Sequence, residues 1–179
     1  GKPVDFRGAF ARLKVDLRGL YLSAYQSALW NRMLSRWIEQ SVDADACFDV
    51  PLLSGPARFF RSSQIDGELH DLTLPLPSAR LKLAEGPIAE LIGSVIADEQ
   101  LELRQLRVKY PRDSFFSKAS RRAVVRPGGL SVEAGDDEMY AKSRKLRLSF
   151  NLPRGSYATV LVKRLMSAPA ERRKDQTDA

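Results

Sequence analysis

The sequence is poor in the residues that build disulfide frameworks and metal centres. It contains one cysteine, Cys47, and one histidine, His70, among 179 residues. A single cysteine excludes an internal disulfide framework and is typical of a reducing cytoplasm, which is where we expect the protein to act. A metal site needs several converging ligands, and His70 has only Asp71 beside it. We therefore expect no metal, and we interpret His70 as an ordinary surface or packed side chain.

Long apolar runs are also lacking. Every apolar run is broken by Lys, Arg or Glu well before the ~18 residues that a membrane-spanning helix needs, so we expect no membrane association. The N-terminal segment GKPVDFRGAF has no apolar core of signal-peptide length, and we expect no export. Because the first residue is Gly rather than Met, we expect the sequence to come from a longer chain.

Cations outnumber anions in this chain. The sequence contains 29 Lys and Arg residues against 22 Asp and Glu residues, which gives a formal net charge of +7. Such a balance favours polyanionic partners, above all nucleic acid, because binding releases the counterions of the phosphates. Charge alone indicates a class of partner and no particular one.

Helical periodicity is strongest in the segment LSAYQSALWNRMLSRWI. Its apolar residues recur at spacings of three and four, which predicts one apolar helix face. Ser23 and Gln26 form a capping-box pattern, so we expect the helix to begin there. We predict a second helix over about 86–97, with Pro87 at its first position, and a third capped by Asp98 that ends before Pro111. The apolar stripe of the first helix is most simply interpreted as core packing and comprises Leu22, Tyr25, Leu29, Met33, Trp37 and Ile38.

The remaining sequence predicts short strands. Residues 41–83 hold short apolar pieces between turn signals, with ARFF as one strand. Further along, RRAVVRP, LSVEA and KLRLSFNLP predict an antiparallel meander. The last of these alternates apolar and polar residues, as a half-buried strand does. The fold class expected is α+β, with helices packed on an antiparallel or mixed sheet.

The segment PRGSYATVLVKRLM predicts a turn followed by a helix. Pro153 ends the preceding strand, and Gly155 permits a tight backbone turn. Ser156 can cap a helix whose apolar face carries Val160, Leu161 and Leu165. Residues 168–179 are polar, and we expect them to be disordered.

Two segments resemble a known family. RGLYLSAYQSALWNRMLSRWI, residues 18–38, resembles the helix that opens the insertion domain of TruD-type tRNA pseudouridine synthases, and SFNLPRGSYATVLVKRLM, residues 149–166, resembles the strand, turn and helix near their C-terminus. RRAVVRP followed by LSVE is also similar to the family. The resemblance implies isomerisation of uridine to pseudouridine in RNA, with the tRNA of the family name as the expected partner, and without a cofactor or a metal.

The resemblance also implies a division of the chain. Residues 1–17 would be a lead-in segment, 18–144 the TruD-type insertion domain, and 145–167 a strand and helix that return to the catalytic domain, before the tail at 168–179. The family's catalytic aspartate lies in a G-x-K-D motif that this sequence lacks, and Asp5, Asp16 and Asp45 stand in other contexts. We therefore assign no catalytic residue to this chain and expect a missing N-terminal catalytic portion to supply it.

Two groups of residues are candidates for contact with RNA. Arg154, Gly155, Ser156 and Tyr157 open the last predicted helix, where a free N-terminus, a guanidinium and an aromatic ring suit a phosphate and a base. These four residues could equally serve only the turn, the cap and the core. The second group would position the RNA backbone, or would simply form a solvated charged face, and comprises Arg121, Arg122, Arg126, Lys145 and Arg147.

Two hypotheses about function follow. In the first, the chain is part of a pseudouridine synthase and supplies RNA binding and active-site support. In the second, it is a non-catalytic RNA-binding module. The final strand and helix favour the enzyme, because an isolated insertion domain has little reason to keep them. Without partner strands their apolar faces would be exposed.

Overall fold

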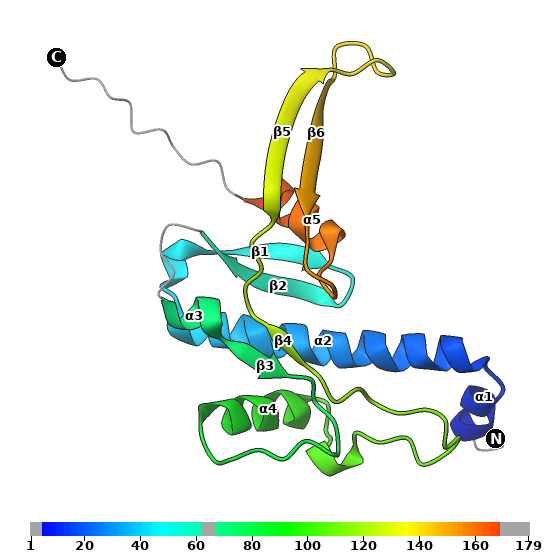
Figure 1. Ribbon diagram of the computed structural model, residues 1–179. Coiled ribbons are helices and arrows are strands. Elements are labelled where there is room, and N and C mark those ends of the chain that lie inside the picture. Colours follow the sequence, from blue (N-terminus) through cyan, green and yellow to red (C-terminus); the bar gives the residue numbers. More distant parts are fainter. Residues whose placement is uncertain (1–4, 62–66, 169–179) are drawn as a thin grey trace.

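The computed structural model describes residues 5–61 and 67–168, which form an α+β structure around a long helix (Figure 1). The helices are α1 (Phe6–Ala11), α2 (Val15–Ser41), α3 (Gly67–Asp71), α4 (Pro87–Asp98) and α5 (Ala158–Ser167). The strands are β1 (Cys47–Leu52), β2 (Gly55–Phe60), β3 (Thr73–Pro75), β4 (Ser120–Arg122), β5 (Gly128–Asp136) and β6 (Arg144–Asn151). Short 3-10 turns lie at Ala44–Ala46 and Leu103–Gln105. The α+β class expected from the sequence is confirmed.

Helix α2 forms the centre of the core. It lies between α4 and the β1–β2 hairpin (Figure 1). Leu29 and Met33 are fully buried, as their spacing predicted, and pack with α4 and β3. Ile38 belongs to a second cluster with Phe60 and Leu69. Burial of each such side chain stabilises the fold by about 1.5–3 kcal/mol, so this helix is the main attachment point for the other elements.

The expected start of this helix at Ser23 is wrong. Helix α2 begins at Val15, inside the segment predicted to be a lead-in, and Ser23 is exposed in its interior. Gln26 is buried and bonds to distant backbone instead of capping. Its Nε2 donates to the carbonyl oxygens of Pro77 (2.8 Å) and Ser117 (2.9 Å), and its Oε1 accepts from the Ser117 N–H (3.2 Å). A tertiary contact therefore uses the side chain that resembled half of a capping box.

Arg18 holds the N-terminal part of the helix to two other segments. Its side chain is buried, with Nη1 donating to the carbonyl oxygens of Ala11 (3.0 Å) and Leu13 (2.7 Å). Nε donates to Ser114 Oγ (3.0 Å), and Nη2 forms an ion pair with Asp113 (2.6 Å). We call these five residues the Arg18 clasp. It fixes the end of α1 and the loop before β4 to the same turn of α2.

The strands form separate antiparallel pairs in the described residues. These pairs are β1–β2, β3–β4 and β5–β6. ARFF lies in β2, as predicted. The expected three-stranded meander is wrong, because β4 pairs with β3, with Leu74 opposite Arg121, and not with β5. The buried side chain of Leu74 draws β3 into the core, and β4 follows it there.

The segment after α4 is the other departure from the predicted elements. Pro87 opens α4 at its first position, as expected. Asp98 is the last residue of that helix and does not cap a third one. Gln100 has a left-handed φ of 57°, which breaks the helical path, and only the short turn Leu103–Gln105 follows. The remaining residues up to Pro111 are extended, with Leu106 buried as an anchor.

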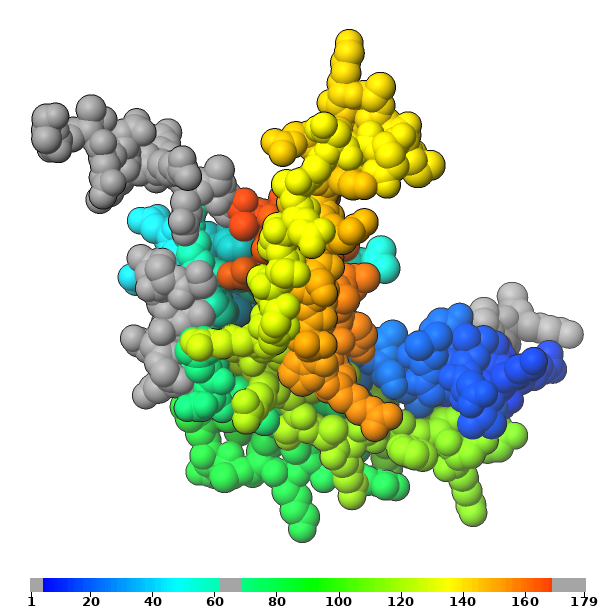
Figure 2. Space-filling view, turned by 45° about the horizontal axis from the view of Figure 1, so that its top comes forward, coloured from blue at the N-terminus to red at the C-terminus, as the bar shows by residue number. Residues whose placement is uncertain are grey.

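The β5–β6 hairpin extends away from the rest of the molecule, with its tip clear of the other elements (Figures 1 and 2). The alternation in β6 correctly predicted a strand, but Leu146 is 59% exposed, and Leu148 and Phe150 are half-buried. The expected half-buried strand is therefore wrong at Leu146, because β6 has only β5 beside it. Residues 169–179 of the predicted disordered tail lie outside the described residues.

Helix α5 is attached to the β1–β2 hairpin. The guanidinium of Arg164 donates to the carbonyl oxygen of Phe60 (2.9 Å) and lies 5.9 Å from the centre of the Phe48 ring. Burial lowers the pKa of Arg164. Lys163 on the same helix donates to the carbonyl oxygen of Pro51 (2.9 Å). The helix thus holds the turn before it, residues 153–157, close to the body of the protein.

Candidate nucleic-acid interface

The predicted turn before α5 is present. Gly155 has a φ of +89°, which favours glycine, and the Ser156 N–H donates to the carbonyl oxygen of Pro153 (3.1 Å). The expected cap by Ser156 is wrong, because Tyr157 occupies the N-cap position and no side chain caps the helix. Tyr157 is 57% exposed and Arg154 is exposed. Both side chains are therefore available to a ligand.

The three arginines around β4 have different surroundings. The guanidinium of Arg121 donates to Ser27 Oγ (3.1 Å) and lies 6.0 Å from the centre of the Trp30 ring. Arg126 Nη2 lies 3.1 Å from His70 Nε2, and His70 is half-buried, which agrees with its interpretation as an ordinary surface or packed side chain. Arg122 is exposed. Arg121 thus ties β4 to α2, whereas Arg122 and Arg126 are both exposed and accessible to a phosphate.

The two predicted cations of β6 face acidic partners. Lys145 forms an ion pair with Glu138, and this contact lowers the pKa of that carboxyl group. Arg147 lies opposite Glu133 on β5, with a nitrogen–oxygen distance of 3.6 Å. Both pairs lie at the surface, where water screens the attraction and ion pairs add little to stability. The hairpin therefore presents mixed charge, and both of its cations predicted to contact RNA have acidic neighbours.

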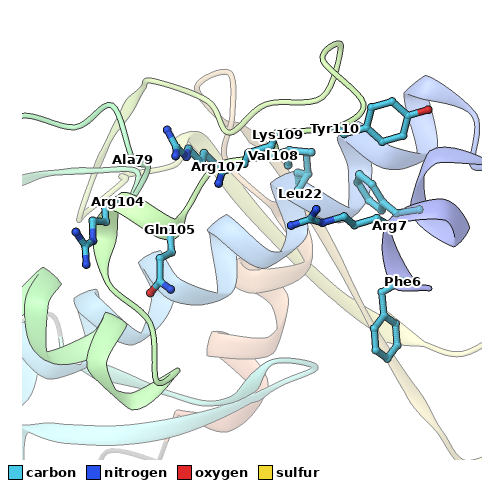
Figure 3. Close-up of a pocket in the computed structure, with 11 residues that line it drawn as sticks. Phe6, Arg7, Leu22, Ala79, Arg104, Gln105, Arg107, Val108, Lys109 and Tyr110 are labelled. Carbon is cyan, nitrogen blue, oxygen red and sulfur yellow. The ribbon is translucent and has the colours of Figure 1, made fainter. Parts of the chain in front are cut away.

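A groove that the sequence analysis missed lies beside α1. It has a volume of about 940 Å³ and is lined by α1, by Leu22 of α2, by Ala79 and by residues 104–110 (Figure 3). We call it the α1 groove. Its basic residues are Arg7, Arg104, Arg107 and Lys109, and its aromatic ones Phe6, Phe10 and Tyr110. The run RQLRVKY carries a signal for it, but the predicted third helix includes these residues.

Two chemical features are absent from the part of the chain that the structure describes. There is no group of three or more histidine, cysteine or acidic side chains that could hold a metal ion. Within residues 5–61 and 67–168, every helix is too short or too polar to span a bilayer.

The chain matches a family model and named relatives over most of its length. The family model described as tRNA pseudouridine synthase D (TruD) matches residues 1–165. The tRNA pseudouridine synthase D of Aquifex aeolicus is 32% identical over 163 residues, which cover 90% of this chain and 40% of the relative. Human pseudouridylate synthase 7 homolog is 26% identical over 182 aligned positions, covering 88% of this chain and 27% of the relative. The chain thus spans less than half the length of these relatives.

A solved structure shares the fold of the chain. The crystal structure described as that of the putative tRNA pseudouridine synthase D (TruD) from Methanosarcina mazei superimposes with a TM-score of 0.62 at 24% identity. The match covers 93% of this chain and 42% of that one. Because the family model covers almost the whole described chain, the conclusion does not depend on this likeness. The chain belongs to the tRNA pseudouridine synthase D (TruD) family.

Proposed function

We propose that this chain is part of an RNA pseudouridine synthase acting on tRNA in the cytoplasm, and that it supplies RNA binding and active-site support. The match of residues 1–165 to the TruD family model carries this proposal. Relatives that bear the enzyme's name extend well beyond the matched region. We therefore place the catalytic carboxylate in a portion of the polypeptide outside these 179 residues.

The reaction defines what such a chain must contribute. The N1–C1′ bond of uridine breaks, the uracil turns, and a C5–C1′ bond forms while C5 loses its proton and N1 gains one. The base must leave its stack and be held in a pocket for this to occur. A carboxylate acts at the sugar and base. A cation for the phosphate and an aromatic ring for the base would be the contributions of this chain.

The turn at Arg154–Tyr157 is the best candidate for that contribution. The exposed ring of Tyr157 can stack on a base, which contributes about 1–3 kcal/mol per base in single-stranded complexes. The exposed guanidinium of Arg154 can bind a phosphate in its planar fork. A core role for Tyr157 is less well supported, because more than half of the side chain is exposed.

The exposed apolar surface of the hairpin favours an enzyme over a free-standing binding module. Leu130 and Val132 on β5 are 48% and 56% exposed, and Leu146 on β6 is 59% exposed. Large exposed apolar side chains on a two-stranded hairpin are typical of a surface that another part of the protein covers. We propose that the catalytic portion covers it.

An assay of uridine isomerisation on tRNA tests the proposal. We expect the full-length gene product to form pseudouridine and the 179-residue chain alone to form none. In the full-length protein, Tyr157→Ala should lower kcat/KM by about tenfold, since one stacked base is lost. The matched control is Tyr21→Ala, a tyrosine on α2 that is 55% exposed and lies outside both the turn and the hairpin, and it should keep full activity.

Three outcomes would contradict this scheme. Isomerisation by the 179-residue chain alone would place the catalytic carboxylate within it. A full-length product that binds tRNA and isomerises nothing would establish the binding-module alternative. Equal activity losses in the Tyr157 and Tyr21 variants would remove the turn from the active site.

A further inference from the structure

The α1 groove has the electrostatic character of a site for a polyanion. Its lining contains four cationic side chains and no acidic one. Arg104 is paired with Glu102 just outside the groove. Arg7, Arg107 and Lys109 are exposed and have no ion-pair partner among the described residues. Three free positive charges around one concave surface attract phosphate groups.

Aromatic rings lie among these cations. Tyr110 is 61% exposed and Phe6 is 77% exposed, and both lie at the same end of the groove (Figure 3). An exposed ring beside cations is the arrangement by which proteins bind single-stranded nucleic acid, since every base presents a face that can stack. Duplex RNA keeps its bases stacked on each other, so such rings favour an unpaired segment.

The walls of the groove are held in place from behind. The Arg18 clasp fixes the end of α1 through Ala11 and Leu13, and it fixes the chain just after Tyr110 through Asp113 and Ser114. At the other end of the wall formed by residues 104–110, Leu106 is buried and its carbonyl oxygen accepts from the Ala79 N–H (3.0 Å). Residues 107–110, of which Val108 is half-buried and the others are exposed, thus lie between two fixed points. A site built this way loses little conformational entropy when a ligand binds.

We infer that the α1 groove binds a single-stranded segment of the RNA substrate, at a place distinct from the Arg154–Tyr157 turn. Arg7, Arg107 and Lys109 bind its phosphates, and Tyr110 stacks on one base. The inference rests on the proposed function only in naming the polyanion as RNA. A groove of about 940 Å³ also has room for a nucleotide and its neighbours.

Fluorescence anisotropy with a labelled oligouridylate of about ten nucleotides, a length within the usual range of single-strand sites, tests the inference. The full-length protein is titrated at several salt concentrations. We expect R107Q/K109Q to lower the slope of log Kd against log salt by about 1.4, the value for two lost single-strand phosphate contacts. Tyr110→Ala should weaken binding about tenfold, and Tyr110→Phe should restore it because the ring is kept.

The matched control is K82Q/K142Q, which removes the same charge from two exposed lysines outside the groove. It should leave the affinity within about twofold of the wild type, because each lost charge is solvated and lies outside the lining of the groove. Equal losses in the two double variants would overturn the inference, because only overall charge would then matter. Unchanged binding in Tyr110→Ala would overturn it as well.

The groove could instead be covered by another part of the same polypeptide. In that case R107Q/K109Q would lower the melting temperature of the full-length protein and leave the salt slope unchanged, and the inference would fall. The outcome is separable from the proposed function. If the full-length protein isomerises nothing but the groove variants still lose oligouridylate binding, the inference about the groove is supported. If the full-length protein is active but the groove variants bind oligouridylate as the wild type does, the inference is overturned.

Discussion

The guanidinium of Arg18 and the carboxylate of Asp113 form an ion pair of 2.6 Å between residues that are 95 positions apart in the sequence. The two partners are unequally exposed: the side chain of Arg18 is 6% exposed and that of Asp113 is 49% exposed. Arg18 also binds two carbonyl oxygens and a hydroxyl group. Arg18 therefore holds the Arg18 clasp together, and Asp113 is one of its several partners.

Replacing Arg18 should be far more damaging than replacing Asp113. Arg18→Met leaves Ala11, Leu13 and Ser114 without their buried donor, and we expect a loss of about 2–3 kcal/mol in the free energy of unfolding. Asp113→Asn keeps an acceptor at a half-exposed position and should cost less than about 1 kcal/mol. Urea unfolding of both variants measures the difference. Equal losses would contradict the account of the clasp.

Glu99 should make stability depend on pH in the acid range. Hydrogen bonds from Arg32 and Tyr25 lower the pKa of Glu99 in the folded protein. A carboxyl group with a depressed folded pKa stabilises the protein above its unfolded pKa, and this contribution is lost as the pH falls through the folded pKa. We expect the gap in unfolding free energy between wild type and Glu99→Gln to narrow below about pH 4.3, the usual value for Glu. A gap that is constant with pH would contradict this.

Tyr25 should show the opposite dependence in alkali. Burial, followed by its hydrogen bond to Glu99, raises the pKa of Tyr25 to about 12. Because the folded pKa lies above the unfolded one, the contribution of Tyr25 is present below the unfolded pKa and is lost as the pH rises through about 12. Ultraviolet titration of tyrosinate in wild type and Tyr25→Phe isolates this group. The variant should lack the titration step near pH 12.

Arg164 should anchor α5 more strongly than its neighbour Lys163. Arg164→Ala removes the bond to the Phe60 carbonyl oxygen and the contact with the Phe48 ring, and should cost about 1–2 kcal/mol. Lys163→Ala removes one exposed contact and should cost no more than ~0.5 kcal/mol. Hydrogen exchange should accelerate across α5 in the first variant alone. Equal protection in both variants would assign the anchoring to other contacts.

Gly155 and Gly19 should respond oppositely to alanine. A Cβ at either position has nothing within 4 Å, so the backbone alone decides the result. Gly155 has a φ of +89°, and Gly155→Ala should destabilise by about 1–2 kcal/mol. Gly19 lies inside α2, and Gly19→Ala should stabilise by up to ~1 kcal/mol. Thermal unfolding of the two variants decides, and the same sign of change for both would contradict the argument.

Local patterns in the sequence were enough to predict the elements whose own residues define them. The spacing of Leu29 and Met33 identified α2, Pro87 identified the start of α4, and the alternation in β6 identified a strand. Gly155 identified the turn before α5. Each of these signals acts over a few residues, because helix faces, strand alternation and tight turns depend on short-range geometry. The α+β class followed from their sum.

Pairing between distant segments could be obtained only from the tertiary structure. The true start of α2 depends on Arg18 meeting residues 113 and 114, and the position of β4 depends on Leu74 entering the core. The predicted RNA cations Arg121, Lys145 and Arg147 acquired protein partners for the same reason. The sequence by itself determined that the chain is basic and that it carries the family's segments. Folding decided which cations are neutralised and which line the α1 groove. Charges are paired by proximity in space, and the order of residues along a chain does not specify that proximity.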